Sequence, residues 1–227
     1  MAYTLITANR NYSSWSLRPW LLMRALGIPF EDRIEPFLLP DNYEAFRAFS
    51  PSGLVPVLIE GTRTVWDSFG IVLYLAERHA GVWPDDADAR AWAQCATAEM
   101  HAGFGAVREA YLMNVGVRVA PSPPLPHLEQ QIARLGEIWA EGLARFGGPW
   151  LAGEAFTAVD AFYAPVAFRV RTYGLDVGAA GAAWVARVLE HPAMREWEDA
   201  ALAESWREAS HEEELAAAGT LLADHRA

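Results

Sequence analysis

The feature that most constrains this chain is a change in hydrophobic pattern partway along it. Up to about His79, short apolar runs typical of strands alternate with helical segments. From about Asp86 onward, alanine-rich helical periodicity dominates and strand patterns almost vanish. Between the two regions, Ala80-Gly81-Val82-Trp83-Pro84-Asp85 has the glycine and proline typical of a linker. We therefore expect two domains, at residues 1–80 and 86–227.

The first region alternates strand and helix in a defined order. The expected elements are a strand over 3–7, a helix over 17–26 that stops at Gly27, a weaker strand over 30–37, hairpin strands over 55–60 and 64–66, and a helix over 68–79. This order of strand, helix, strand, hairpin and helix is that of an α/β thioredoxin-like domain.

The second region is expected to be an all-α helical-bundle domain. One apolar stripe with helical spacing predicts a helix packed on a bundle, and it comprises Leu128, Ile132, Leu135, Trp139, Leu143 and Phe146. Thr157-Ala158-Val159-Asp160 has the form of a capping box, which stabilises a helix start by about 1 kcal/mol. Residues 120–124 are predicted to form a loop, and residues 208–214 a solvated acidic helix face.

Composition excludes several classes of protein. Hydrophobic residues make up 52% of the chain and charged residues 21%, a balance that excludes a disordered chain. No apolar run approaches the ~20 residues of a membrane span, and the start of the chain lacks the pattern of a signal peptide. The net charge of −11 opposes binding to nucleic acid or anionic lipid. The single Cys95 excludes a two-cysteine redox motif and a cysteine-rich zinc site. We expect a cytoplasmic protein without a metal.

A pair of serines is predicted to lie at the start of the first helix. Pro19 belongs in or just after the first turn, which places the helix start near Trp15 and Ser13-Ser14 immediately before it. The helix dipole and its unpaired amides favour an anion at that place. The alternative is that both serines only cap the helix.

Two further motifs suggest a site that binds a peptide-like ligand. Val55-Pro56 is the peptide bond where a cis conformation costs least, and a cis bond there would turn the Val55 amide and carbonyl outward. The alternative is a trans proline at the start of an edge strand. Asp67-Ser68 begins the helix expected after the hairpin, where a simple helix cap is the alternative.

Together these motifs resemble the cytosolic glutathione transferase family over nearly the whole chain. Residues 12–18 resemble the serine motif of the zeta-type and related serine classes, and Val55-Pro56 resembles the family's cis-proline turn. Residues 66–71 resemble its acidic-Ser motif, and residues 150–160 its capping-box segment. Leu17 and Trp15 depart from the zeta-type motif, so the maleylacetoacetate isomerase activity of that class is not carried over.

The resemblance implies glutathione as cosubstrate and assigns roles to particular residues. Ser13, with Ser14 as the alternative, would stabilise the glutathione thiolate, because a free thiol of pKa ~8.5 is only about 3% ionised at pH 7. The other implied binding residues are Val55 and Pro56 for the cysteinyl backbone, Asp67 for the γ-glutamyl ammonium, Ser68 for its carboxylate, and His101 and Arg108 at an electrophile pocket between the domains. Arg47 is a conceivable binding partner for the glycyl carboxylate of glutathione.

The implied function is that of a glutathione S-transferase that attacks a small hydrophobic electrophile in detoxification. Isomerisation or dehalogenation through glutathione would use the same residues. The alternative is a noncatalytic binding or interaction protein of the same fold. The resemblance also implies a homodimer.

Overall fold

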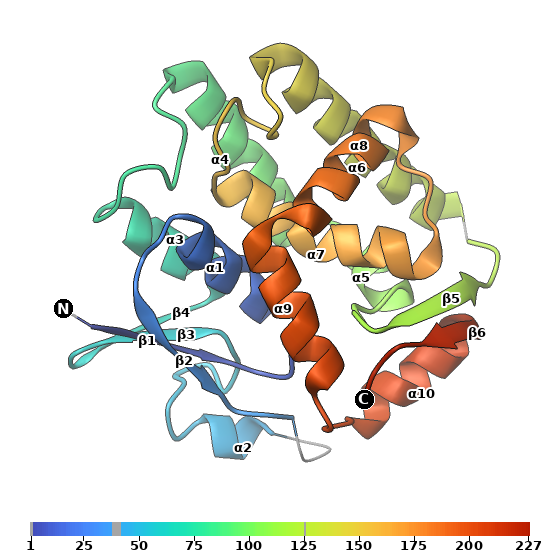
Figure 1. Cartoon of the computed structure of the whole chain (residues 1–227). Helices are drawn as coiled ribbons and strands as arrows, with labels where there is room; N and C mark the ends of the chain where they lie inside the picture. Colours follow the sequence, from blue (N-terminus) through green and yellow to red (C-terminus); the bar gives the residue numbers. More distant parts are fainter. Residues whose placement is uncertain (1, 38–41, 125) are drawn as a thin grey trace.

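The computed structural model describes residues 2–37, 42–124 and 126–227, and in Figure 1 a small sheet lies beside a larger group of helices. The first part of the chain contains β1 (Tyr3–Thr7), α1 (Ser14–Ala25), β2 (Phe30–Ile34), α2 (Tyr43–Phe46), β3 (Val57–Glu60), β4 (Arg63–Trp66) and α3 (Ser68–Ala76). This is the element order that the sequence predicted, with the addition of the short α2.

The four strands form one mixed sheet in the order β2-β1-β3-β4. β1 pairs parallel with β2 and antiparallel with β3, and the β3–β4 hairpin turns at Gly61, whose φ is +60°. Gly27, with φ of +64°, follows α1 in the left-handed conformation that commonly ends a helix. The strand order and the α1 crossover confirm the thioredoxin-like arrangement.

The second part is helical and contains one small sheet. Its elements are α4 (Ala87–Ala102), α5 (Gly105–Ala110), β5 (Val117–Pro121), α6 (Pro126–Phe146), α7 (Ala158–Tyr173), α8 (Gly178–Glu190), α9 (Pro192–Ala203), α10 (Ala209–Ala218) and β6 (Gly219–Asp224). The predicted apolar stripe lies on α6, where Leu128, Leu135 and Trp139 are buried. None of the helices within the described ranges combines the length and apolar character that a membrane crossing needs.

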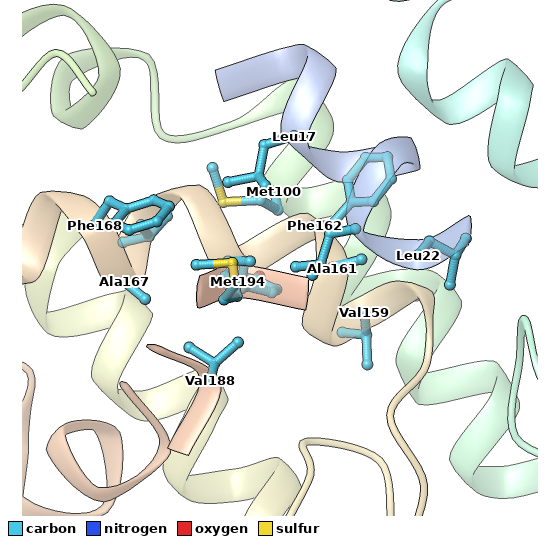
Figure 2. Packing of buried hydrophobic residues seen from close by; sticks show 14 of the residues in the cluster. Leu17, Leu22, Met100, Val159, Ala161, Phe162, Ala167, Phe168, Val188 and Met194 are labelled. Carbon is cyan, nitrogen blue, oxygen red and sulfur yellow. The ribbon is translucent and has the colours of Figure 1, made fainter. Parts of the chain in front are cut away.

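Helix α7 is the centre of the core and links the two parts. Every residue from Ala158 to Arg169 is buried. Figure 2 shows Phe162 and Phe168 of α7 among side chains from α1, α4, α8 and α9. Because α1 packs directly on α7, the serines at the start of α1 are held against the helical part.

The start of α7 is anchored through Asp160, as the predicted capping box requires. Its carboxylate accepts a hydrogen bond from the Thr157 amide at 3.1 Å, and it also accepts from the Leu151 amide and the Trp184 indole, each at 3.0 Å. The Ala158 amide donates to the Val82 carbonyl at 2.9 Å, so the capped segment also holds the predicted linker. We keep the division into residues 1–80 and 86–227 as a proposal.

Two predictions for the helical part were only partly right. Ala120 and Pro121, predicted as loop, belong to β5, which pairs antiparallel with β6. The acidic residues of 208–214 are not all solvated, because Glu208 is buried and Glu212 accepts hydrogen bonds from Tyr12 and Arg226. Both errors arise from partners distant in sequence, which local pattern does not reveal.

Candidate active site

A cavity of about 680 Å³ lies between the sheet part and the helical part. The predicted site residues that line it are Ser13, Ser14, Val55, Pro56, Asp67, Ser68 and Arg108. Its remaining wall includes Trp15 from α1, Leu112 and Met113 from the segment after α5, and His211 from α10. The structure therefore brings together motifs that are far apart in sequence.

The two serines differ in what their hydroxyl groups contact. Ser13 is the N-cap of α1, and its Oγ donates a hydrogen bond to Ser16 Oγ at 2.7 Å. Ser14 is the first helical residue, and its Oγ accepts from Nη2 of Arg169 at 3.4 Å. Ser14 donates to no described residue, so its hydroxyl hydrogen is available to an anion in the cavity. This geometry favours Ser14, the alternative in the sequence analysis, over Ser13.

The Val55–Pro56 peptide bond is cis, as the sequence suggested. Val55 precedes β3, and its peptide group lies outside the paired register of the sheet. Both residues line the cavity. The backbone of Val55 is thus placed where an extended ligand would meet it.

Asp67 and Ser68 stand at the start of α3 on the same cavity. Asp67 caps the helix by accepting from the Phe69 amide at 2.8 Å, yet it has a φ of +57°, which is uncommon for a residue other than glycine. Strained backbone of this kind is often retained where a side chain must be aimed at a ligand. The Ser68 hydroxyl is buried without a hydrogen-bond partner among the described residues. A ligand carboxylate would satisfy that hydroxyl.

His101 lies behind Asp67 and is not part of the cavity lining. Its Nε2 is 3.6 Å from Oδ1 of Asp67, and its ring packs against Trp15 and Phe69. Burial lowers the pKa of His101, and Arg18 and Arg108 add to this effect while Asp67 opposes it. Its imidazole is therefore neutral at pH 7.

The structure adds cavity residues that sequence reasoning missed. Arg169 of α7 is buried and lines the cavity beside Ser14. His211 reaches the cavity from α10, where its ring stacks on Tyr12 at 4.8 Å and its Nδ1 is 2.6 Å from Glu208. Neither residue stands in a local motif, so only an alignment of relatives could have indicated them. Arg47 does not line the cavity.

Comparison with known proteins shows the same architecture elsewhere. A family model described as "Glutathione S-transferase, N-terminal domain" matches residues 12–78, and another described as "Glutathione S-transferase, C-terminal domain" matches residues 85–200. A zeta class glutathione S-transferase from Euphorbia esula is 24% identical over 157 residues, which cover 67% of this chain and 70% of that protein.

Solved structures agree at the level of the fold. The theta class glutathione S-transferase of Xanthomonas axonopodis pv. citri, solved with glutathione bound, is 23% identical and gives a TM-score of 0.62 over 89% of this chain and 98% of its own. A trimeric glutathione transferase from Leishmania is 17% identical, with a TM-score of 0.68 over 87% of this chain and 44% of its own. With both family models matched in order along one chain, this protein belongs to the glutathione S-transferase family of enzymes.

Proposed function

We propose that this protein is a glutathione S-transferase that ionises the thiol of bound glutathione for attack on a small electrophile. Family membership supports the use of glutathione, and the theta class relative carries that ligand in its structure. The observation that carries the proposal is the placement of a helix-start serine, a cis-proline turn and an Asp-Ser pair on one cavity. We further propose a role in detoxification in the cytoplasm.

The γ-glutamyl and cysteinyl residues of glutathione each have a complementary group on this cavity. The γ-glutamyl ammonium would meet the Asp67 carboxylate, and its carboxylate would accept from the unpartnered Ser68 hydroxyl. The Val55 backbone would pair with the cysteinyl residue, as a strand pairs with an added strand. This arrangement would extend glutathione along the segment before β3 and direct its sulfur toward α1.

The thiolate would lie at the start of α1, beside Ser14. A hydroxyl that donates to an anion stabilises it by about 1.5–3 kcal/mol, which is roughly one to two pKa units. The Arg169 guanidinium, 3.4 Å from Ser14 Oγ, adds a positive charge behind that hydroxyl. The helix dipole acts in the same direction.

The proposal is tested by measuring glutathione binding and conjugation together. Calorimetric titration should show binding, and an aryl halide or an enone should react with glutathione faster in the presence of the protein. Asp67→Ala is expected to weaken glutathione binding, because it removes the partner of the ammonium. Binding without turnover would favour a noncatalytic binding protein, and the absence of binding would refute both readings.

Glutathione affinity is expected to fall as the pH drops below about 6.5 in the wild-type protein. His101 has a lowered pKa, so it is neutral at pH 7 and gains its proton only as the pH falls through that lowered value. The imidazolium would then compete with the γ-glutamyl ammonium for Asp67. An exposed ion pair contributes up to about 1 kcal/mol. We therefore expect the Kd for glutathione to increase roughly twofold to fivefold.

Calorimetry on wild type and His101→Asn between pH 5 and pH 7 would measure this effect. The carboxyl and amino groups of glutathione titrate near pH 3.5 and 8, roughly, and so outside this window. The variant should therefore show a flatter profile than the wild type. Parallel profiles for the two proteins would contradict the assignment to His101.

We also propose that the protein is a homodimer, as the family resemblance implies. The Leishmania relative is described as a trimer, so family membership alone does not fix the number of subunits. Sedimentation equilibrium should give twice the chain mass of 25.1 kDa. A mass of one or three chains would refute the dimer.

A further inference from the structure

Three arginine side chains lie near Trp15 and Ser14, beside the cavity. The guanidinium carbon of Arg18 is 3.9 Å from the centre of the Trp15 ring, and that of Arg108 is 5.2 Å from it. Arg169 contacts the neighbouring Ser14. Burial lowers the pKa of Arg18, and the positive charges of Arg169 and Arg108 lower it further. The three cations are therefore close enough to repel one another.

Arg108 and Arg169 line the cavity, and neither has a carboxylate partner among the described residues. Nη1 of Arg108 donates to the carbonyls of Met100 and Gly103, at the end of α4, and its Nε and Nη2 donate to no described residue. Arg169 donates to the carbonyls of Tyr111 and Pro165 and to the Ser14 hydroxyl. Both guanidinium groups therefore line the cavity without a carboxylate beside them among the described residues.

In the proposed function, several charged groups of glutathione already have a partner on the cavity wall. Asp67 is the one carboxylate among the described residues of its lining, and in the proposed function its charge is matched by the ammonium of glutathione. Arg169 lies beside Ser14 and would face the thiolate, which leaves Arg108 as the guanidinium of the described lining without an assigned anion. Partly buried guanidinium groups gain most from a carboxylate, which they bind through charge-assisted hydrogen bonds.

The groups beside these arginines suit the apolar body of an organic acid. Trp15, Leu112 and Met113 line the same cavity as Arg108. Resting on the proposed function, we propose that the electrophile of this enzyme carries a carboxylate, bound by Arg108. The preferred substrate class is thus an apolar electrophile with an acidic group, which narrows the small hydrophobic electrophile expected from the sequence.

A matched pair of electrophiles tests this assignment. We would use an aryl enone that carries a para carboxylate and the methyl ester of the same compound, with each rate divided by its uncatalysed reaction with glutathione. Wild type is expected to favour the acid over the ester by about tenfold or more in kcat/KM, because a hydrogen bond to a charged group is worth at least that ratio. Equal normalised values would overturn the proposal.

Variants assign the preference to one residue. Arg108→Gln should abolish most of the acid preference, whereas Arg108→Lys should keep part of it. Arg145→Gln removes a positive charge from the exposed side of α6, outside the cavity lining, and should leave the preference unchanged. If Arg108→Gln slowed the acid and the ester equally, Arg108 would serve glutathione or the fold, and the proposal would be wrong.

A binding measurement separates this proposal from the proposed function. S-(4-carboxybenzyl)glutathione and its methyl ester can be titrated by tryptophan fluorescence without any chemical step. Wild type should bind the acid about tenfold more tightly, and Arg108→Gln should bind both alike. Equal binding by wild type would overturn the carboxylate assignment alone. If neither conjugate bound, the proposed function itself would fail, and this inference with it.

Discussion

Replacing Ser14 with alanine is expected to lower kcat/KM for conjugation about tenfold to hundredfold at pH 7. The variant loses the hydroxyl that would donate to the sulfur, since Ser14 Oγ faces the cavity and donates to no described residue. In the variant, the pKa of the bound glutathione thiol should rise by about one to two, toward its value of about 8.5 in water. A smaller fraction of the bound thiol would then be ionised at neutral pH.

The pH dependence of the rate identifies the mechanism. Because the variant still binds glutathione, the rate of Ser14→Ala should approach that of the wild type as the pH rises above the thiol pKa. The ultraviolet absorbance of the thiolate, followed during a pH titration of each complex, measures the pKa directly. An unchanged pKa in Ser14→Ala would contradict the assignment.

Ser13→Ala is the matched control for this prediction. Ser13 donates its hydrogen to Ser16 within the turn before α1, so its loss should affect the rate less than the loss of Ser14. Ser14→Thr keeps a hydroxyl at the same place and should restore part of the rate. A larger effect at Ser13 than at Ser14 would instead support the residue that the sequence motif indicated first.

Asp160→Ala is expected to destabilise the fold by about 3–5 kcal/mol. The Asp160 side chain is fully buried and accepts hydrogen bonds from the amides of Leu151 and Thr157 and from the indole of Trp184. Alanine would leave all three donors buried and without an acceptor. A loss of this size is a large fraction of the total stability of a typical domain.

Urea denaturation followed by circular dichroism would measure the loss, with Asp160→Asn as the control. Asparagine keeps the shape and one acceptor oxygen, which can still serve Leu151 and Trp184, so its cost should be smaller. The Ser14 and Arg108 variants should unfold near the wild-type midpoint. If Asp160→Ala cost less than about 1 kcal/mol, the carboxylate would not be the anchor of α7 that its contacts indicate.

Much of the fold followed from patterns within a few residues. Pro19 placed the start of α1 to within a residue or two, Gly27 ended it, and the capping box marked the start of α7. The cis bond at Val55–Pro56 was one of the two conformations that the sequence left open, since proline lowers the cost of a cis bond. These features depend on backbone geometry and on near neighbours, which a single sequence contains.

The tertiary structure alone decided which side chains share the cavity. Arg169 meets Ser14 across 155 positions, and the Tyr12 hydroxyl meets Glu212 across 200. The β5–β6 pairing likewise joins segments about one hundred residues apart along the chain, so neither strand has a local signal. The sequence by itself determined the two-part architecture, most of the element order in the first part and the family, because these rest on local periodicity and short motifs. The charge of the pocket and the choice between two adjacent serines depend on packing of α1 against α7, which only the folded chain creates.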